Sequence, residues 1–213
     1  MRASRSLPGI GLLLISVGSA VIAGCSNEPA PPPRFKIDPE SAAQEAMTLY
    51  DKDGDGKLDR KELEASPPLR DLLENLKAAD HSHADSLSKE DIAARLEEWR
   101  KATATLLTVV ATVYLDGKPL EGATVTFEPE TFLGASYHTH RGQTNIAGVA
   151  ALDPELKGYP GIYVGLYRVR ISKMVDGKET LPERYNTHTE LGREFANNVR
   201  DMRGNGLFSL KSK

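Results

Sequence analysis

Twelve consecutive residues, 51–62, place oxygen-bearing groups at the spacing that a calcium ion requires. The expected ligands at loop positions 1, 3, 5, 7, 9 and 12 are Asp51, Asp53, Asp55, Lys57, Asp59 and Glu62. Calcium is a hard cation that takes roughly six to eight oxygen ligands, so alternating carboxylates can wrap around it. We expect Lys57 to bind through its backbone carbonyl, Asp59 directly or through a water, and Glu62 with both carboxylate oxygens. Gly56 at position 6 supplies the sharp turn, which needs a positive φ.

This spacing is the EF-hand calcium-loop pattern. An acidic surface turn is the alternative, because Asp and Gly are common in turns. The full match and the flanking helical patterns favour calcium. Asp38-Pro39 is typical of a helix start, and an apolar stripe at helical spacing leads to the loop: Ala43, Ala46, Met47 and Tyr50. A short exiting helix is expected after the loop, with Leu63 on its inner face, until Ser66-Pro67-Pro68 ends it.

Residues 80–91 are a degraded copy of the same loop. Position 8 is leucine in both loops, the place where paired EF-hands join through a short β-contact. The departures from the pattern are Ala84 at position 5, Asp85 in place of the turn glycine, and Asp91 in place of glutamate. Asp80, Ser82 and Ser88 remain as plausible ligands. We interpret this loop as a structural partner of the first and leave calcium binding there open.

Helical patterns flank the second loop as well. The apolar positions that predict them are Leu69, Leu72, Leu73 and Leu76 before the loop, and Ile92, Leu96 and Trp99 after it. We expect Trp99 to be a core residue under the second hand. Residues 37–103 are therefore predicted to form an EF-hand pair.

The first 24 residues are predicted to be a signal peptide, because Arg2 and Arg5 precede an apolar run from Ile10 to Ala23. The run ends in Ile-Ala-Gly-Cys25, which resembles the bacterial lipobox. The resemblance implies that Cys25 becomes the first residue of the mature protein and carries a lipid. Cys25 is the only cysteine, and lipidation would explain an unpaired one in an exported protein. An uncleaved transmembrane anchor is the alternative, but the run is short for a span.

Residues 25–36 are a proline-rich tether that would hold the folded part away from the membrane. The charge of residues 25–213 is unevenly distributed. Residues 25–103 hold 18 acidic and 12 basic residues, a net of −6, whereas residues 104–213 hold 12 and 13, a net of +1. This distribution lacks the basic stripe or patch of a nucleic-acid-binding surface, so no nucleic-acid partner is expected.

From about Thr105 the apolar period changes from helical to two, which predicts short strands. Asp116-Gly117 and Asp176-Gly177 are typical hairpin turns, and short strands with frequent turns favour a β-sandwich. The segment from Val113 to Phe127, VYLDGKPLEGATVTF, together with Thr144-Asn145 and Pro160-Gly161, resembles the carboxypeptidase regulatory-like (transthyretin-like) domains of bacterial exported proteins. That resemblance implies an antiparallel β-sandwich over 104–213 without catalytic residues of its own.

Five histidines invite a transition-metal interpretation. His138 and His140 are two apart on a predicted strand and would share one face. No acidic third ligand follows at motif spacing, although a zinc site usually needs three or four protein ligands. We therefore interpret the pair as polar residues on a solvated strand face, and we expect His81 and His83 to be exposed.

No nucleophile elbow, catalytic cysteine or phosphate-binding glycine loop is recognisable, so we expect no enzymatic activity. The expected protein is α+β with two domains, an EF-hand pair followed by a transthyretin-like β-sandwich. It would be an exported, membrane-anchored bacterial lipoprotein at the periplasmic face or cell surface that binds calcium and presents the sandwich to an unknown protein or glycan. The alternative is a carbohydrate- or peptide-binding accessory module of a secreted hydrolase system.

Overall fold

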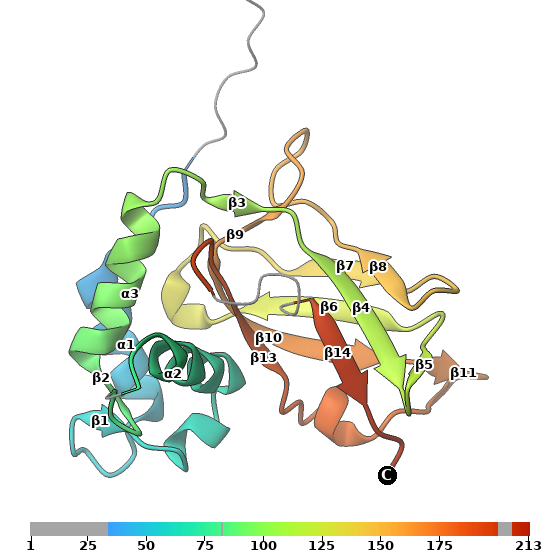
Figure 1. The fold of residues 1–213 in the computed structure, drawn as a ribbon, viewed down its shortest axis with the longest axis horizontal. Helices are drawn as coiled ribbons and strands as arrows, with labels where there is room; N and C mark the ends of the chain where they lie inside the picture. Colours follow the sequence, from blue (N-terminus) through green and yellow to red (C-terminus); the bar gives the residue numbers. More distant parts are fainter. Residues whose placement is uncertain (1–33, 82, 200–205) are drawn as a thin grey trace, which may run out of the picture. The chain divides into compact units, whose positions relative to one another are not determined.

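The computed structural model describes residues 34–81, 83–199 and 206–213. Residues 32–213 form one compact unit of mixed α+β structure, with helices first and strands after them (Figure 1). The predicted signal peptide 1–24, the lipidation site Cys25 and most of the tether 25–36 lie outside the described residues, as does Ser82. The boundary predicted between residues 103 and 104 stays a prediction.

Three α-helices carry the apolar stripes that the sequence predicts. They are α1 (Pro39–Tyr50), α2 (Pro67–Ala79) and α3 (Lys89–Lys101). Asp38 caps α1 by accepting a hydrogen bond from the backbone N–H of Ser41 at 3.2 Å, as its type and position predict. Ser66 caps α2 in the same way. The apolar faces of all three helices are buried, and Trp99 is only 2% exposed, in agreement with its predicted core position.

The short exiting helix expected after the loop is present, and it ends before Ser66-Pro67-Pro68 as predicted. It is a 3₁₀ helix of three residues, Glu62–Glu64, with Leu63 fully buried as expected. Pro67 and Pro68 follow too soon for a longer helix, because proline donates no backbone hydrogen bond and disfavours helical geometry in the residue before it. The chain instead starts α2 at once.

The two loops pair through a short antiparallel ladder between β1 (Lys57–Leu58) and β2 (Leu87–Ser88). Leu58 lies opposite Leu87, and both side chains are fully buried. The predicted contact at loop position 8 is confirmed. It joins the two loops back to back, and α1 packs against α3.

The remaining strands are short. Their bounds are β3 (Leu106–Leu107), β4 (Val110–Leu115), β5 (Lys118–Pro119), β6 (Thr124–Pro129), β7 (His140–Gln143), β8 (Val149–Ala151), β9 (Ile162–Tyr163), β10 (Gly165–Ser172), β11 (Met174–Val175), β12 (Lys178–Glu179), β13 (Gly192–Phe195) and β14 (Leu207–Leu210). Two further 3₁₀ helices span Thr131–Leu133 and Glu183–Tyr185.

The longer strands form two sheets. One has the order β13-β10-β6-β7, with antiparallel neighbours throughout. In the other, β4 pairs with β14 on one side and with β5 and β8 on the other. The β4–β14 pair is parallel, which corrects the expectation of purely antiparallel strands. A parallel neighbour needs a long connection, and the chain between β4 and β14 passes through the other sheet.

Both predicted hairpin turns are present, and each has two successive residues of positive φ. Asp116 and Gly117 have φ of 51° and 81° between β4 and β5, and Asp176 and Gly177 have 49° and 76° between β11 and β12. Positive φ at both central residues matches the twist of the flanking strands. The predicted alternation also holds in β10, where Tyr167, Val169 and Ile171 are fully buried.

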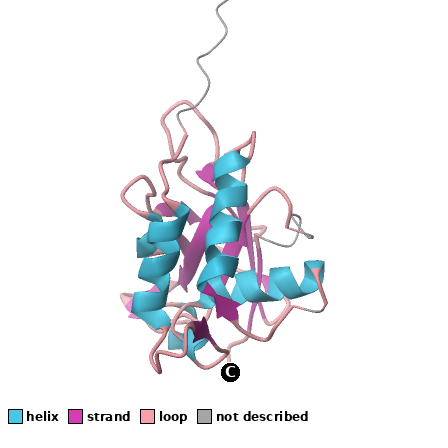
Figure 2. Ribbon diagram, turned by 90° about the vertical axis from the view of Figure 1, so that its left-hand side faces the viewer, coloured by secondary structure: helices cyan, strands magenta, loops and turns pink. Residues whose placement is uncertain are grey.

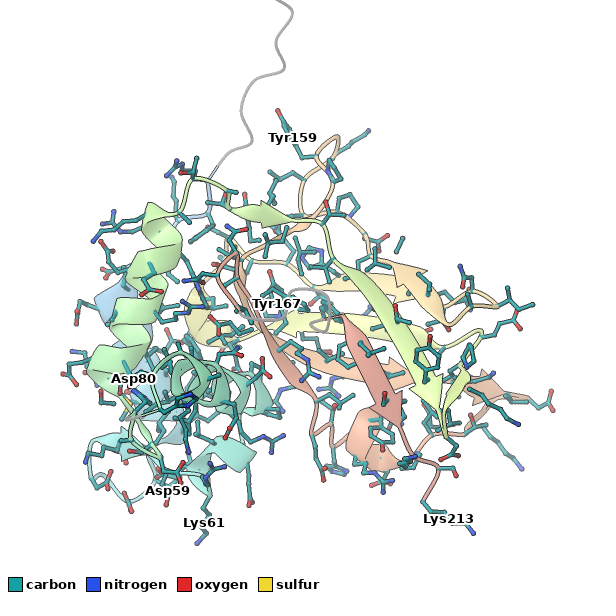
Figure 3. All side chains as sticks on the ribbon, in the orientation of Figure 1. Asp59, Lys61, Asp80, Tyr159, Tyr167 and Lys213 are labelled. Atoms are coloured by element: carbon teal, nitrogen blue, oxygen red, sulfur yellow. The ribbon has the colours of Figure 1, made fainter. Side chains whose placement is uncertain are left out.

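The β core is aromatic. Phe127 of β6 stacks on Phe195 of β13 at 5.1 Å between ring centroids, and Phe208 of β14 meets Phe127 edge-on at 6.1 Å. Tyr167, labelled in Figure 3, lies inside this cluster. Phe35, at the end of the predicted tether, packs against Tyr137 and is 7% exposed. None of the described helices is long and apolar enough to cross a membrane.

The helices pack against one end of the β structure, and Figure 2 views the protein from the side of the helices. The first turn of α2 approaches β13 so closely that a Cβ on Gly192 would stand 2.2 Å from the backbone of Pro67. Only glycine fits there. This contact fixes α2 against the sheet, and the loop 51–62 that precedes α2 is held there with it.

Candidate metal centre

The loop 51–62 folds around its own carboxylates. Asp51 accepts hydrogen bonds from the backbone N–H groups of Gly54 at 2.7 Å and Gly56 at 3.1 Å, one on each oxygen. Gly54 and Gly56 have φ of 75° and 82°, so the turn predicted at position 6 is present. Asp53 and Asp55 each accept a bond from the N–H two residues further on. These hydrogen bonds orient the three aspartate side chains toward the inside of the loop.

The three aspartates meet. One carboxylate oxygen from each of Asp51, Asp53 and Asp55 lies within 4.8 Å of the others, so a single cation can contact all three. All three residues are half-buried or exposed, which leaves the cluster open to solvent ions. Among the described residues, this is the one group of three or more acidic, histidine or cysteine side chains gathered that tightly.

Glu62 closes the loop from the opposite end. Its Oε1 accepts a bond from the N–H of Lys52 at 2.6 Å, and its Oε2 accepts one from the N–H of Asp59 at 3.1 Å. Asp59 returns the contact by accepting from the N–H of Glu62 at 2.9 Å. Glu62 therefore reaches from position 12 to position 2, across the mouth of the loop. Lys57, the expected backbone ligand, is fixed by its pairing with Ser88 in the β1–β2 ladder.

The described residues of the second loop show a different arrangement at position 12. Asp91 accepts hydrogen bonds from the N–H and hydroxyl of Ser88, at 2.8 and 2.7 Å, in a helix-capping box. Among residues 80, 81 and 83–91, no hydrogen bond from Asp91 reaches the first half of the loop. Asp85 points outward to Arg60 of the first loop at 2.8 Å and to Lys77. Figure 3 labels Asp59 and Asp80, one in each of the neighbouring loops.

Glu130, a residue that sequence reasoning did not single out, anchors both ends of the first loop. It lies between β6 and the 3₁₀ helix Thr131–Leu133 and is 5% exposed. Tyr50, directly before the loop, donates its hydroxyl to Glu130 Oε2 at 2.6 Å. Ser66, four residues after the loop, donates to Glu130 Oε1 at 2.7 Å. Burial, and then the Glu130 charge, raise the pKa of Tyr50, so its phenol remains a donor.

A second buried carboxylate joins the other two helices to the sheet. Glu194 of β13 is fully buried and accepts from Arg95 of α3 at 2.5 Å and from Asn75 of α2 at 2.8 Å. Burial raises the pKa of Glu194, and the Arg95 charge offsets part of that rise. Asp71 accepts the backbone N–H of Glu194 at 2.8 Å. Both α2 and α3 are thus attached to β13 through hydrogen-bonded polar groups.

The histidines are arranged differently from the prediction. His138 is 63% exposed at its side chain, but His140 is 1% exposed, so the pair does not share a solvated face. Both rings contact Glu155, from the loop between β8 and β9, at 2.5 Å (His138 Nδ1) and 2.8 Å (His140 Nε2). Burial works to raise the pKa of Glu155, but the bonds from His140 and His138 outweigh it and hold the pKa below its usual value.

This acidic partner was missed because it is not at motif spacing. It comes from a different loop, 15 residues after His140. His81 is exposed as predicted, whereas His83 is half-buried. Arg168, for which no role was predicted, donates to the backbone carbonyl of Ala65 at 2.7 Å and adds to the anchoring of the first loop.

Comparison with known proteins adds no assignment to this geometry: no family model, no curated protein and no solved structure matches the chain.

Proposed function

We propose that this protein binds one calcium ion in the loop 51–62 and uses it to brace a rigid α+β scaffold. The observation that carries the proposal is the gathering of the Asp51, Asp53 and Asp55 oxygens within 4.8 Å of one another, with Glu62 folded over the same loop. Carboxylate and carbonyl oxygens are the donors that calcium prefers. The second loop acts as a structural partner.

The anchoring of the loop favours a structural role over a sensor role. A sensor opens its helix pair on binding calcium and exposes an apolar groove. Here Tyr50 and Ser66, on either side of the loop, both donate to Glu130, so opening the pair would break two hydrogen bonds to a buried carboxylate. Leaving such a group unsatisfied costs about 1–3 kcal/mol or more. Extracellular EF-hand modules bind calcium in roughly the 10⁻⁴–10⁻³ M range, which suits a permanent brace.

The β part is proposed to be a β-sandwich of the transthyretin-like type. The contact of Phe208 with Phe127, which joins a strand of one four-stranded sheet to a strand of the other, supports this arrangement. We further propose that the scaffold is exported and held at a membrane by a lipid on Cys25, with the sandwich as a non-catalytic recognition surface for a protein or glycan. The lipobox resemblance and the apolar run before it support this part.

The test is a calorimetric calcium titration of the full chain and of Glu62→Gln. We expect one site in the parent and a weakening of roughly a hundredfold in the variant, because removing one charged partner from a closed ionic site costs about 3 kcal/mol. Glu64→Gln is the matched control, since Glu64 is an exposed glutamate two residues further along the same 3₁₀ helix. No heat at millimolar calcium, or equal losses in both variants, would refute the proposal.

The brace is tested separately by unfolding. Calcium at about 100 times its dissociation constant should stabilise the protein by about 2.7 kcal/mol, or roughly 5–10 °C in Tm for a unit of this size. The helical and β signals should shift together. A large gain in dye-binding apolar surface when calcium is added to the folded protein would instead indicate a sensor.

A further inference from the structure

The cluster of His138, His140 and Glu155 is the second concentration of ligand groups in the described residues, and it is unlike the calcium-type loop. It contains two imidazole rings and one carboxylate instead of aspartates. The Glu155 side chain is fully buried, and each of its two oxygens faces a nitrogen of a different ring. The three residues come from the segment before β7, from β7 itself and from the loop after β8.

The contacts of the His140 ring require a proton or a metal ion between its Nε2 and Glu155. His140 Nδ1 is 2.9 Å from the backbone carbonyl of Asp153, which can only accept, so Nδ1 carries a proton and donates. In neutral imidazole the other nitrogen, Nε2, then has a lone pair, and it faces Glu155 Oε2 at 2.8 Å. Two lone pairs at that distance repel each other unless a second proton or a metal ion lies between them.

Among the described residues, no other cation is paired with Glu155. Its ion pairs are with His138 and His140, and the groups packed nearby are the phenols of Tyr137 and Tyr163. A buried carboxylate is costly unless it is paired with a positive charge. A divalent ion supplies that charge, and it satisfies both imidazoles once His138 has rotated toward it.

The supporting contacts are those that metal-binding histidines use. A ligating histidine normally donates its other ring N–H to a backbone carbonyl or carboxylate, which fixes its tautomer and orientation, and His140 does so toward Asp153. The loop carrying Glu155 is held in place by backbone bonds, from Asp153 to Arg141 of β7 and from Glu155 to Gly161. Two of the three ligands are therefore positioned before any ion binds.

The third group, His138, is exposed and can move to let an ion enter the cluster. Its side chain is 63% exposed on an irregular segment, so it can rotate. Rotation is required, because Glu155 now lies between the two rings and its oxygens serve them separately. With His138 turned toward the same point, two imidazoles and one carboxylate make three protein ligands and leave a position for water on the solvent side, the ligand number found in open zinc sites.

We propose that His138, His140 and Glu155 form a binding site for one divalent transition-metal ion, of which zinc is the ion to test. The site is separate from the calcium-type loop and its donors suit a different class of metal, since imidazole favours zinc and copper whereas carboxylate and carbonyl oxygens favour calcium. The proposal does not rest on the calcium proposal.

The experiment is a zinc titration of the full chain in the presence of millimolar calcium, which occupies oxygen-rich sites. We expect one zinc ion per chain, and a cobalt-substituted form with visible absorption bands of a nitrogen- and oxygen-ligated ion. His138→Ala should weaken zinc binding at least tenfold, since the loss of even a supporting partner of a ligand costs roughly 10–100-fold. This variant should fold normally because His138 is exposed.

His188→Ala is the matched control. His188 also contacts a glutamate, Glu183, at 3.0 Å, but both side chains are about four-fifths exposed, and no third ligand group in the described part of the chain joins them. It should bind zinc as the parent does. Absence of stoichiometric zinc, or an affinity unchanged by His138→Ala, would overturn the proposal and assign the positive charge at Glu155 to a protonated imidazole. Equal losses in the two variants would overturn it as well.

Discussion

The two paired loops have the same length and the same leucine at position 8, and they supply the two strands of one ladder. Among the described residues, the side chain at position 12 reaches back across the first loop but not across the second. Glu62 reaches the N–H of Lys52 across the first loop, whereas Asp91, one methylene shorter, is engaged by Ser88 three residues before it. The first loop turns its aspartates inward, and the second sends Asp85 outward to Arg60. The two loops differ in the ligand side chain at position 5, in the glycine at position 6 and in the carboxylate length at position 12.

The attachments of the two loops also differ. The first loop is held at both ends by Glu130, while the second is followed by α3, which contacts the sheet through Arg95 and Glu194. The first loop is therefore tied to the β part by residues close to its two ends, and the second through the helices that flank it. This arrangement suits a calcium ion that stabilises the whole unit more than one that moves a helix.

The largest effect is expected when Glu62 is replaced by aspartate, the residue that the second loop has at position 12. Glu62→Asp should weaken calcium binding roughly a hundredfold, because the shorter carboxylate no longer reaches across the loop and an ionic partner worth about 3 kcal/mol is lost. Calorimetry measures the effect, with Glu64→Asp as the control. Unchanged affinity would show that carboxylate length does not distinguish the loops.

The reverse exchange gives the second loop the ligand and turn residues of the first. A combined Ala84→Asp, Asp85→Gly and Asp91→Glu variant restores ligands at positions 5 and 12 and the turn at position 6. We expect a second calcium ion to bind in roughly the 10⁻⁴–10⁻³ M range of extracellular modules. Asp91→Glu alone should add little. If the combined variant still binds one ion, the backbone of residues 80–91 and not its side chains prevents binding.

Tyr50→Phe tests the anchor that the first loop has and the second lacks. Removal of the hydroxyl leaves one Glu130 oxygen without its donor and should destabilise the protein by about 1.5–3 kcal/mol, the range for hydrogen bonds to charged groups. Chemical denaturation followed at Trp99 and by hydrogen exchange in β10 measures the loss. Tyr114→Phe, at a half-buried tyrosine of β4, should change stability far less.

The smallest effect is expected at the contact between the loops. Hydrogen bonds from Arg60 and Lys77 lower the pKa of Asp85 to about 2. A lowered acidic pKa stabilises the folded state above the ordinary aspartate pKa, and that contribution is lost as pH falls toward 2. Asp85→Asn should therefore be slightly less stable than the parent at pH 7 and equal to it near pH 2. A difference that grows on acidification would contradict this assignment.

Local features of the chain were predictable because their causes lie within a few residues. The inward aspartates of the first loop and the Asp38 cap depend on side chains contacting backbone two to five positions away. The turns at residues 116–117 and 176–177 depend on two successive residues of positive φ, which Asp-Gly pairs favour. The short exiting helix was predictable for a local reason as well, since two prolines end it after a single turn. The parallel β4–β14 pair had no local signal at all.

The sequence alone determined the candidate calcium loop, because its six ligand groups fall within twelve consecutive residues and any chain that closes such a loop brings them together. Tertiary structure alone decided what the loop is attached to and which histidines have a carboxylate. Tyr50 and Glu130 are 80 residues apart, and His138 and Glu155 are 17 apart in different segments. Contacts of that kind depend on how strands and helices pack, and packing is set by the whole core and not by the spacing of any one motif.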